Sequence, residues 1–156
     1  MAPKPKRLDV MLESILESVD VAESMIMRIS DSAGFTDEEC HKIGMAIREG
    51  VINAYNYGNR KDRNKKIRMI VELAADTMVI HIVDQGKGFE LEEVADPLAE
   101  ENLLRTSGRG IFLMRAFMDD FTVQRGPEGG ADLVLTKKLP IPGSNNGDGG
   151  SRGKES

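Results

Sequence analysis

Residues 37–57 constrain the fold of this chain most, because they predict one long helix with two different faces. One face carries small or apolar residues at helical spacing, namely Ile43, Ala46, Ile47, Gly50, Val51 and Ala54. On another face Glu49, Asn53 and Asn56 follow at i, i+4 and i+7. Apolar residues border this polar face, and buried polar groups need partners because their desolvation is costly. The alternative is an ordinary amphipathic helix whose polar face meets solvent.

Composition narrows the class of protein. The 156 residues suffice for one domain with its own core, and 40% hydrophobic with 30% charged residues argues against wholesale disorder. A net charge of -5 and only 4% aromatic residues argue against a direct nucleic-acid partner. Apolar runs fall short of the about 20 residues that cross a bilayer, and the basic N-terminus lacks the apolar stretch of a secretory signal. We therefore expect a cytoplasmic protein without a membrane partner.

Cysteine and histidine usage limits the metal chemistry. Cys40 is the single cysteine, which excludes an internal disulfide, and only His41 and His81 could join it at a zinc site. We expect His81 to be a half-exposed strand residue rather than a ligand.

Hydrophobic periodicity and turn signals predict the remaining elements. Strands are predicted at 7–13, 67–74, 77–83, 121–125 and 132–139, and helices at 20–32, 37–57 and 111–118. A capping box of Thr36 and Glu39 starts the long helix, and Gly34 ends the helix before it. This order indicates an α+β fold, a two-layer sandwich whose mixed, mostly antiparallel sheet is covered on one face by helices. Residues 1–6 and 141–156 are expected to be flexible tails around one domain at 7–140.

A first glycine motif follows the strand at 77–83. Alternation places Ile80, Ile82 and Asp84 on the same, core-facing side, and the motif reads Asp84-x-Gly86-x-Gly88. The glycines would let the backbone turn and approach a flat ligand closely. The alternative is an Asx-type turn that only leaves the strand.

A second glycine motif, Ser107-Gly108-Arg109-Gly110, opens the helix predicted at 111–118. Free N–H groups at a helix N-terminus bind anions, and Arg105 and Arg109 could add charge-assisted bonds to phosphate oxygens. The alternative is a flexible hinge with arginines in solvent.

Together, and in this order, the motifs resemble the N, G1 and G2 boxes of the GHKL ATP-binding fold. The matching residues are Glu49-x-x-x-Asn53, Asp84-x-Gly86-x-Gly88 and Gly108-Arg109-Gly110. The single-domain size and the run at 108–119 are similar to the anti-sigma factor serine kinases of the RsbW and SpoIIAB type. The resemblance covers residues 8–139.

The resemblance implies ATP and Mg²⁺ as cofactors. Glu49 would be the general base toward the hydroxyl of a partner serine, and Asn53 would coordinate Mg²⁺ between the phosphates, with Asn56 beside the same cofactor. Asp84 would accept a hydrogen bond from the adenine amino group.

The glycine motifs would complete the nucleotide pocket. Gly86 and Gly88 would shape its adenine end, and residues 85–107 would form a lid over ATP. The phosphates would be bound by Arg105, Ser107, Gly108, Arg109 and Gly110.

Two positions depart from the family pattern. The family often has a Gly-Thr-Thr-like sequence before its last strand, with a Thr near adenine, where this chain has Gly130-Ala131-Asp132. An arginine often lies just before the Ser-Gly of the lid, whereas Thr106 separates Arg105 from Ser107 here.

The resemblance implies a serine/threonine protein kinase with two partners. It would phosphorylate a small anti-anti-sigma protein of the STAS type and sequester a sigma factor, and nucleotide state would switch between them. Homodimers are suggested by the same resemblance. The alternative from another class is an ATP-gated binding module without phosphotransfer, such as a phosphatase activator or a sigma-factor binder.

Overall fold

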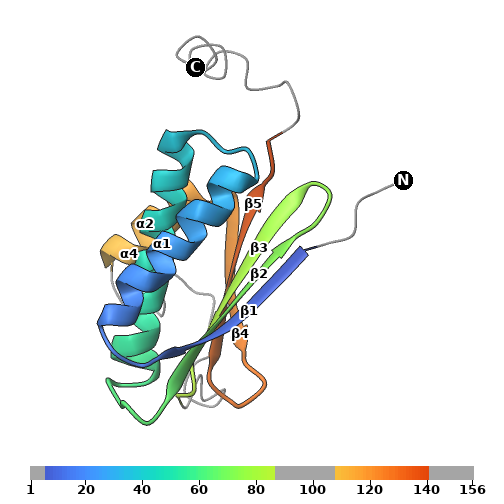
Figure 1. Ribbon diagram of the computed structural model, residues 1–156. Helices are drawn as coiled ribbons and strands as arrows, with labels where there is room; N and C mark the ends of the chain where they lie inside the picture. The colour runs from blue at the N-terminus through green and yellow to red at the C-terminus, as the bar shows by residue number, and fades with distance from the viewer. Residues whose placement is uncertain (1–5, 87–107, 141–156) are drawn as a thin grey trace.

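The computed structural model describes residues 6–86 and 108–140 as one antiparallel sheet with helices on one side (Figure 1). Along the chain the elements are β1 (Lys6–Glu13), α1 (Glu17–Ser32), α2 (Asp37–Asn53), η1 (Ala54–Gly58), β2 (Lys66–Leu73), β3 (Thr77–Val83), α4 (Gly108–Phe117), β4 (Asp120–Arg125) and β5 (Ala131–Lys138). This order confirms the α+β architecture predicted from the sequence. None of the helices in the described ranges is long and apolar enough to cross a membrane.

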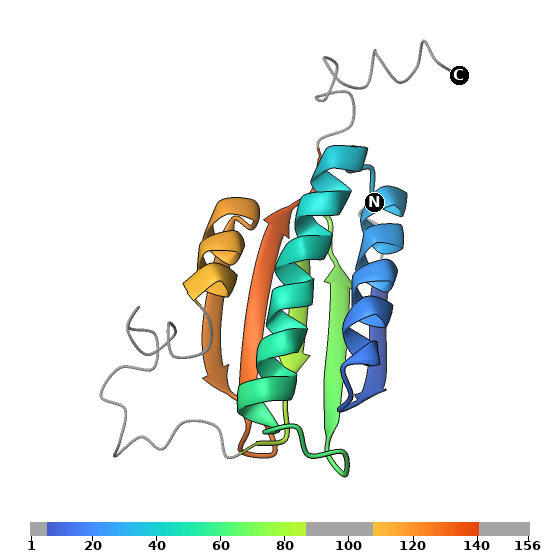
Figure 2. The same cartoon turned by 90° about the vertical axis from the view of Figure 1, so that its left-hand side faces the viewer.

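The five strands lie in the order β1-β2-β3-β5-β4, and all four pairings are antiparallel. β1 is therefore at an edge of the sheet. In Figure 2 the three helices lie side by side over the same face of the sheet, with α2 in the middle. The strand residues that face them are buried, including Ile67, Met69, Met78, Ile80 and Leu135. This layering makes α2 the helix that packs over the centre of the sheet.

α2 begins at the capping box that the sequence predicted. Thr36 Oγ1 accepts a hydrogen bond from Glu39 N at 3.1 Å, and Glu39 Oε1 accepts one from Thr36 N at 2.9 Å. The apolar stripe predicted for this helix is buried as a whole. Gly50 is part of it, and a methyl group added there would lie 2.6 Å from Ile82 Cδ1. The glycine therefore lets the helix approach the sheet closely.

The long helix does not stay α-helical to residue 57 as predicted. α2 ends at Asn53, and η1 continues it as a π-turn in which Asn59 N donates to Ala54 O at 2.7 Å. A π-turn holds more residues per turn than an α-helix, so the spacing that placed Asn56 on the face of Glu49 no longer applies. The sequence carries no periodicity signal for this change, because the π-turn is only 5 residues long.

α1 differs from the prediction in its start, because it begins at Glu17 rather than at residue 20. Val19, Ala22 and Ile26 form its buried stripe, whereas Val21 is 48% exposed.

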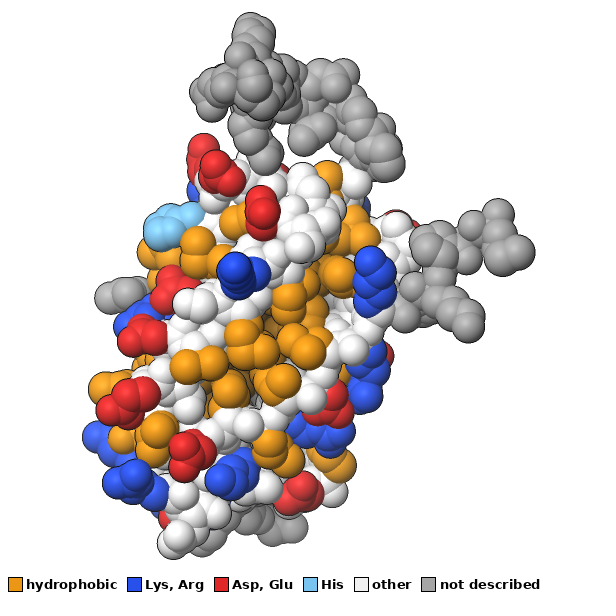
Figure 3. All heavy atoms as spheres, viewed as in Figure 1, with side chains coloured by type: hydrophobic (Ala, Val, Ile, Leu, Met, Phe, Trp, Pro, Cys, Tyr) orange, Lys and Arg blue, Asp and Glu red, His pale blue; other side chains and the backbone are white. Residues whose placement is uncertain are grey.

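The face of the molecule that carries α1 and β1 is partly apolar. Figure 3 shows hydrophobic side chains gathered over the seam between these two elements. Leu8 of β1 is 37% exposed, and only Leu12 of that strand is buried. The edge strand is thus covered less completely than the central strands β2 and β3.

Candidate functional site

Asp84 follows β3 directly and lies buried at the end of the sheet. Its Oδ1 accepts hydrogen bonds from Gly86 N at 2.9 Å and from Ala131 N at 3.1 Å. Burial raises the pKa of the Asp84 carboxyl, and the two backbone hydrogen bonds oppose that shift. The bond to Gly86 is the Asx-type turn considered as the alternative, and it holds the carboxylate in a fixed direction.

The backbone packs tightly around this carboxylate at three glycines. A methyl group added to Gly58 would overlap Asp84 Oδ2, and one added to Gly130 would overlap the Asp84 backbone oxygen. One added to Gly86 would overlap the Gly58 carbonyl oxygen. Gly86 was predicted as a pocket residue, whereas Gly58 and Gly130 were not. Their contribution depends on contacts between segments distant in sequence, which a glycine in a one-dimensional pattern does not reveal.

Glu49, Asn53 and Gly110 meet on the side of α2 that faces the start of α4. A methyl group on Gly110 would lie 3.4 Å from Glu49 Oε1 and 3.5 Å from Asn53 Nδ2. Glu49 is only 5% exposed. The first and third sequence motifs therefore form one site, although about 55 residues of chain separate Asn53 from Gly108.

The Asn53 side chain carries a buried oxygen that could bind a ligand. Within the described residues its Oδ1 is buried and has no hydrogen-bond partner. A buried amide oxygen without a partner is unfavourable unless a ligand or water satisfies it. An oxygen of this kind suits Mg²⁺, which prefers oxygen donors.

The start of α4 adds the N-terminus of a helix to this site. Gly108 and Gly110 lie in its first turn, so the glycine motif is part of the helix rather than a segment before it. The first N–H groups of a helix lack intrahelical partners and favour anions. This end of α4 lies beside the Glu49 and Asn53 side chains, so a phosphate group bound there would be close to both.

Several predicted residues lie outside what the structure describes. They are Gly88, Arg105 and Ser107, together with the side chain of Arg109. Asn56 is half-buried within η1. Their predicted roles stay predictions.

The residues present fit a magnesium nucleotide. Asp84 offers a buried carboxylate acceptor, Asn53 offers a buried amide oxygen, and Gly110 lies in the first turn of α4 beside Asn53. In the two described stretches no three His, Cys, Asp or Glu side chains form a group that could hold a metal. Asn53 Oδ1 is a described oxygen at this place that could hold such an ion.

His81 is a half-buried strand residue, as predicted. Its Nδ1 lies 3.0 Å from Asp132 Oδ1, and Asp132 also accepts from Gln124 Nε2 at 3.0 Å. These side chains belong to neighbouring strands β3, β5 and β4.

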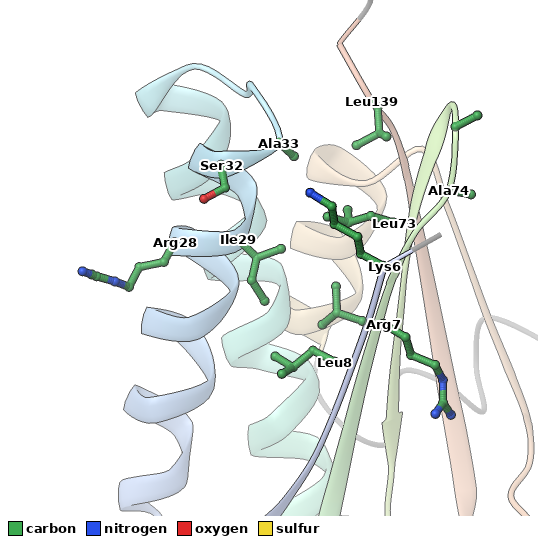
Figure 4. Close-up of a pocket in the computed structure, with 12 residues that line it drawn as sticks. Lys6, Arg7, Leu8, Arg28, Ile29, Ser32, Ala33, Leu73, Ala74 and Leu139 are labelled. Atoms are coloured by element: carbon green, nitrogen blue, oxygen red, sulfur yellow. The ribbon is translucent and has the colours of Figure 1, made fainter. Parts of the chain in front are cut away.

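A cavity of about 570 Å³ lies away from the candidate site, between the end of α1, the start of β1 and the β2–β3 hairpin (Figure 4). Leu8, Ile29, Leu73 and Leu139 line it, while the Arg28 guanidinium points away from it. The hairpin is at the opposite end of β3 from Asp84. The cavity is therefore separate from the candidate site.

The chain is similar to known proteins over most of its length. The family model of the histidine kinase-like ATPase domain matches residues 12–137. An anti-sigma F factor of Bacillus velezensis is 35% identical over 106 residues, covering 67% of this chain and 73% of the relative. A serine-protein kinase RsbW of Oceanobacillus iheyensis is 28% identical over 129 residues, covering 79% of this chain and 80% of the relative.

A solved structure has the same fold. It contains the RsbU and RsbW domains of a Mycobacterium tuberculosis protein, and it matches 88% of this chain with a TM-score of 0.62 and 18% sequence identity. This chain spans 33% of that longer chain.

Proposed function

The chain belongs to the histidine kinase-like ATPase domain family, and on that premise we propose that it is an ATP-dependent serine/threonine protein kinase that also acts as an anti-sigma factor. The names of its relatives, anti-sigma F factor and serine-protein kinase RsbW, support both parts of this function. Its substrate would be an anti-anti-sigma protein of the STAS type, and its second partner a sigma factor. Both partners would be met in the cytoplasm.

One observation carries the proposal: a buried carboxylate and an unsatisfied amide oxygen lie together at a helix N-terminus. Glu49 and Asn53 come from one turn of α2, and Gly110 brings α4 to them. In this reading Glu49 accepts the proton of the serine hydroxyl as that oxygen becomes the nucleophile. A carboxylate suits this role, because phosphoryl transfer depends mainly on positioning and charge neutralisation and needs the base only late.

Asp84 would select adenine in the nucleotide. Its carboxylate accepts hydrogen bonds but does not donate them when ionised, so it favours a base with an amino group over one with a carbonyl. The backbone bonds from Gly86 and Ala131 fix its direction. Ala131 lies in the segment where the family often has a Thr. At this position its backbone N–H donates to the Asp84 carboxylate.

Asn53 and the start of α4 would hold the phosphate end. Asn53 Oδ1 would bind Mg²⁺, and the N–H groups of the first turn of α4 would bind phosphate oxygens. When bound, ATP supplies the phosphoryl group and Mg²⁺ neutralises its charge.

The test is phosphotransfer from γ-labelled ATP with Mg²⁺ into a lysate of the source organism. We expect one small labelled protein with the wild type. Glu49→Gln should lower the labelling rate at least about a hundredfold while ATP still binds, because a general base contributes that much. Asp84→Asn should abolish both ATP binding and labelling.

The alternative is an ATP-gated binding module without phosphotransfer. ATP binding that depends on Asp84, without any labelled protein, would favour it. Unchanged labelling by Glu49→Gln would instead refute the role of Glu49 as base.

A further inference from the structure

We infer that Asn59 is a positioning residue for adenine recognition, acting through the backbone that carries Asp84. The inference rests on the proposed function in one respect, the role of Asp84 as the adenine acceptor. Asn59 follows the π-turn directly and is not part of the three motifs. It lies in the connection between η1 and β2.

Asn59 joins three segments that are far apart in the sequence. Its Oδ1 accepts a hydrogen bond from Gln85 N at 2.8 Å. Its Nδ2 donates to Ser14 Oγ at 3.1 Å and to Lys66 O at 3.0 Å. The side chain thus connects the exit of β3 with the end of β1 and the start of β2. Asn59 is 0% exposed, and its bond to Ser14 is buried.

The Asn59 backbone is fixed as firmly as its side chain. Its N–H donates to Ala54 O at 2.7 Å, closing the π-turn, and its carbonyl accepts from Asp62 N at 3.0 Å. The amide group therefore reaches Gln85 from a rigid support. The π-turn therefore sets the point at which the chain leaves the helix.

The bond to Gln85 completes a series at the exit of β3. Three successive N–H groups are each bound by a different partner. Asp84 N donates to Ala131 O at 3.0 Å, Gln85 N to Asn59 Oδ1, and Gly86 N to the Asp84 carboxylate itself. Without Asn59, the Gln85 N–H would lose its acceptor in a half-buried place, and the strand exit could relax.

Relaxation at this point would redirect the Asp84 carboxylate. Its Oδ2 lies against Gly58, the residue before Asn59, and its Oδ1 is held by Gly86, the residue after Gln85. The carboxylate is therefore enclosed by the two segments that the Asn59–Gln85 bond connects. A hydrogen bond to a base depends on this direction, because such bonds weaken steeply as their angle departs from linearity. Loss of the Asn59 acceptor should reduce adenine selectivity more than general nucleotide binding.

Ser14→Ala provides a matched comparison. It removes the acceptor of one Asn59 donor bond but leaves the bonds to Lys66 and Gln85. Asn59→Ala removes all three, and Asn59→Asp keeps an acceptor oxygen for Gln85. If Asn59 had only a structural role, Ser14→Ala and Asn59→Ala would differ in stability but not in their preference for ATP.

The experiment measures dissociation constants of ATP and of purine riboside triphosphate, which lacks the amino group that Asp84 would bind. Wild type, Asn59→Ala, Asn59→Asp and Ser14→Ala are compared well below their melting temperatures. We expect the wild type to prefer ATP by at least about tenfold, as for one hydrogen bond to a charged group. Asn59→Ala should bind ATP about tenfold more weakly and lose most of this preference. Asn59→Asp and Ser14→Ala should keep it.

Equal preference for ATP in Asn59→Ala and the wild type would overturn the inference. Loss of the preference in Ser14→Ala to the same degree would also overturn it. If Asn59→Ala does not fold, Asn59→Asp decides, because a lost preference there refutes the acceptor role and a retained one supports it. A wild type that binds both nucleotides equally would instead refute the role of Asp84 itself, and a wild type that binds neither would refute ATP binding.

Discussion

At the residue scale, the site depends on buried polar groups that have no hydrogen-bond partner or have partners at only one oxygen. Asp84 is buried with two backbone N–H groups at one oxygen, and Asn53 Oδ1 is buried without a partner in the described structure. Such groups destabilise the protein without ligand and gain a partner when one binds. Both come from motifs that the sequence singled out.

The raised pKa of Asp84 leads to a prediction about stability without nucleotide. A carboxyl whose pKa is higher in the folded than in the unfolded state favours folding fully below its ordinary pKa of 3.8. That contribution is lost as pH rises through the raised pKa, because the buried group must then ionise. The free energy of unfolding of the wild type should therefore fall relative to that of Asp84→Asn across this window.

Urea denaturation of both proteins between pH 3.5 and 8, in the absence of nucleotide, measures this difference. Parallel curves for the two proteins would mean that burial does not raise the pKa of Asp84.

At the element scale, α2 and the first turn of α4 form the site together. α4 is held at this place by its own apolar residues, since Leu113 and Met114 are buried. Lys42 of α2 also lies 5.8 Å from the centre of the Phe117 ring, at the other end of α4. Packing further along the helix therefore holds α4 in place, so the glycine motif at its start needs no apolar side chains of its own.

Gly110→Ala tests whether the start of α4 is a phosphate cradle. The added methyl would meet Glu49 and Asn53 at ordinary contact distances of 3.4 and 3.5 Å, so it should fit without strain. Alanine also favours a helix over glycine by up to about 1 kcal/mol. We expect unchanged or higher thermal stability, but ATP affinity lower by at least about tenfold, because the methyl occupies the space beside both polar side chains.

Thermal melting and nucleotide titration on the same preparation separate the two effects. Full ATP affinity in Gly110→Ala would place the phosphates elsewhere.

At the scale of the whole molecule, the site is built where one helix crosses one end of a single sheet. α2 packs over the sheet at Gly50, next to Glu49, and β3 delivers Asp84 at its end. The distance between helix and sheet therefore influences both halves of the proposed nucleotide site. The sheet order β1-β2-β3-β5-β4 places β3 at its centre.

Gly50→Ala should disturb this packing. The methyl would lie 2.6 Å from Ile82 Cδ1 and 3.0 Å from Leu133 Cδ2, and overpacking of a core costs about 1–3 kcal/mol of unfolding free energy. Gly44→Ala is a matched control on the same helix. Its methyl would meet Met27 Cγ at 2.8 Å, but a methionine side chain adapts easily, so its effect should be smaller.

Chemical denaturation measures both variants. An equal loss of stability in the two would mean that the contact of α2 with the sheet at Gly50 is no tighter than its contact with α1 at Gly44.

The order of elements, the capping box at Thr36 and the buried stripe of α2 could be predicted from the sequence. So could the candidate polar residues Glu49, Asn53 and Asp84. These features depend on local periodicity and on hydrogen bonds between near neighbours, which a linear pattern records. The Asx turn at Asp84 is of the same kind, since it joins residues two apart.

Which of these residues meet depends on the packing of the folded chain. It brought Gly110 to Glu49, enclosed Asp84 between Gly58 and Gly130, and connected Asn59 to the distant residues Ser14 and Gln85. It also converted the end of the long helix into a π-turn, which removed Asn56 from the face predicted for it. These outcomes follow from the close packing of helix, strand exit and loop against one another, and steric limits between distant segments leave no periodic trace in the sequence.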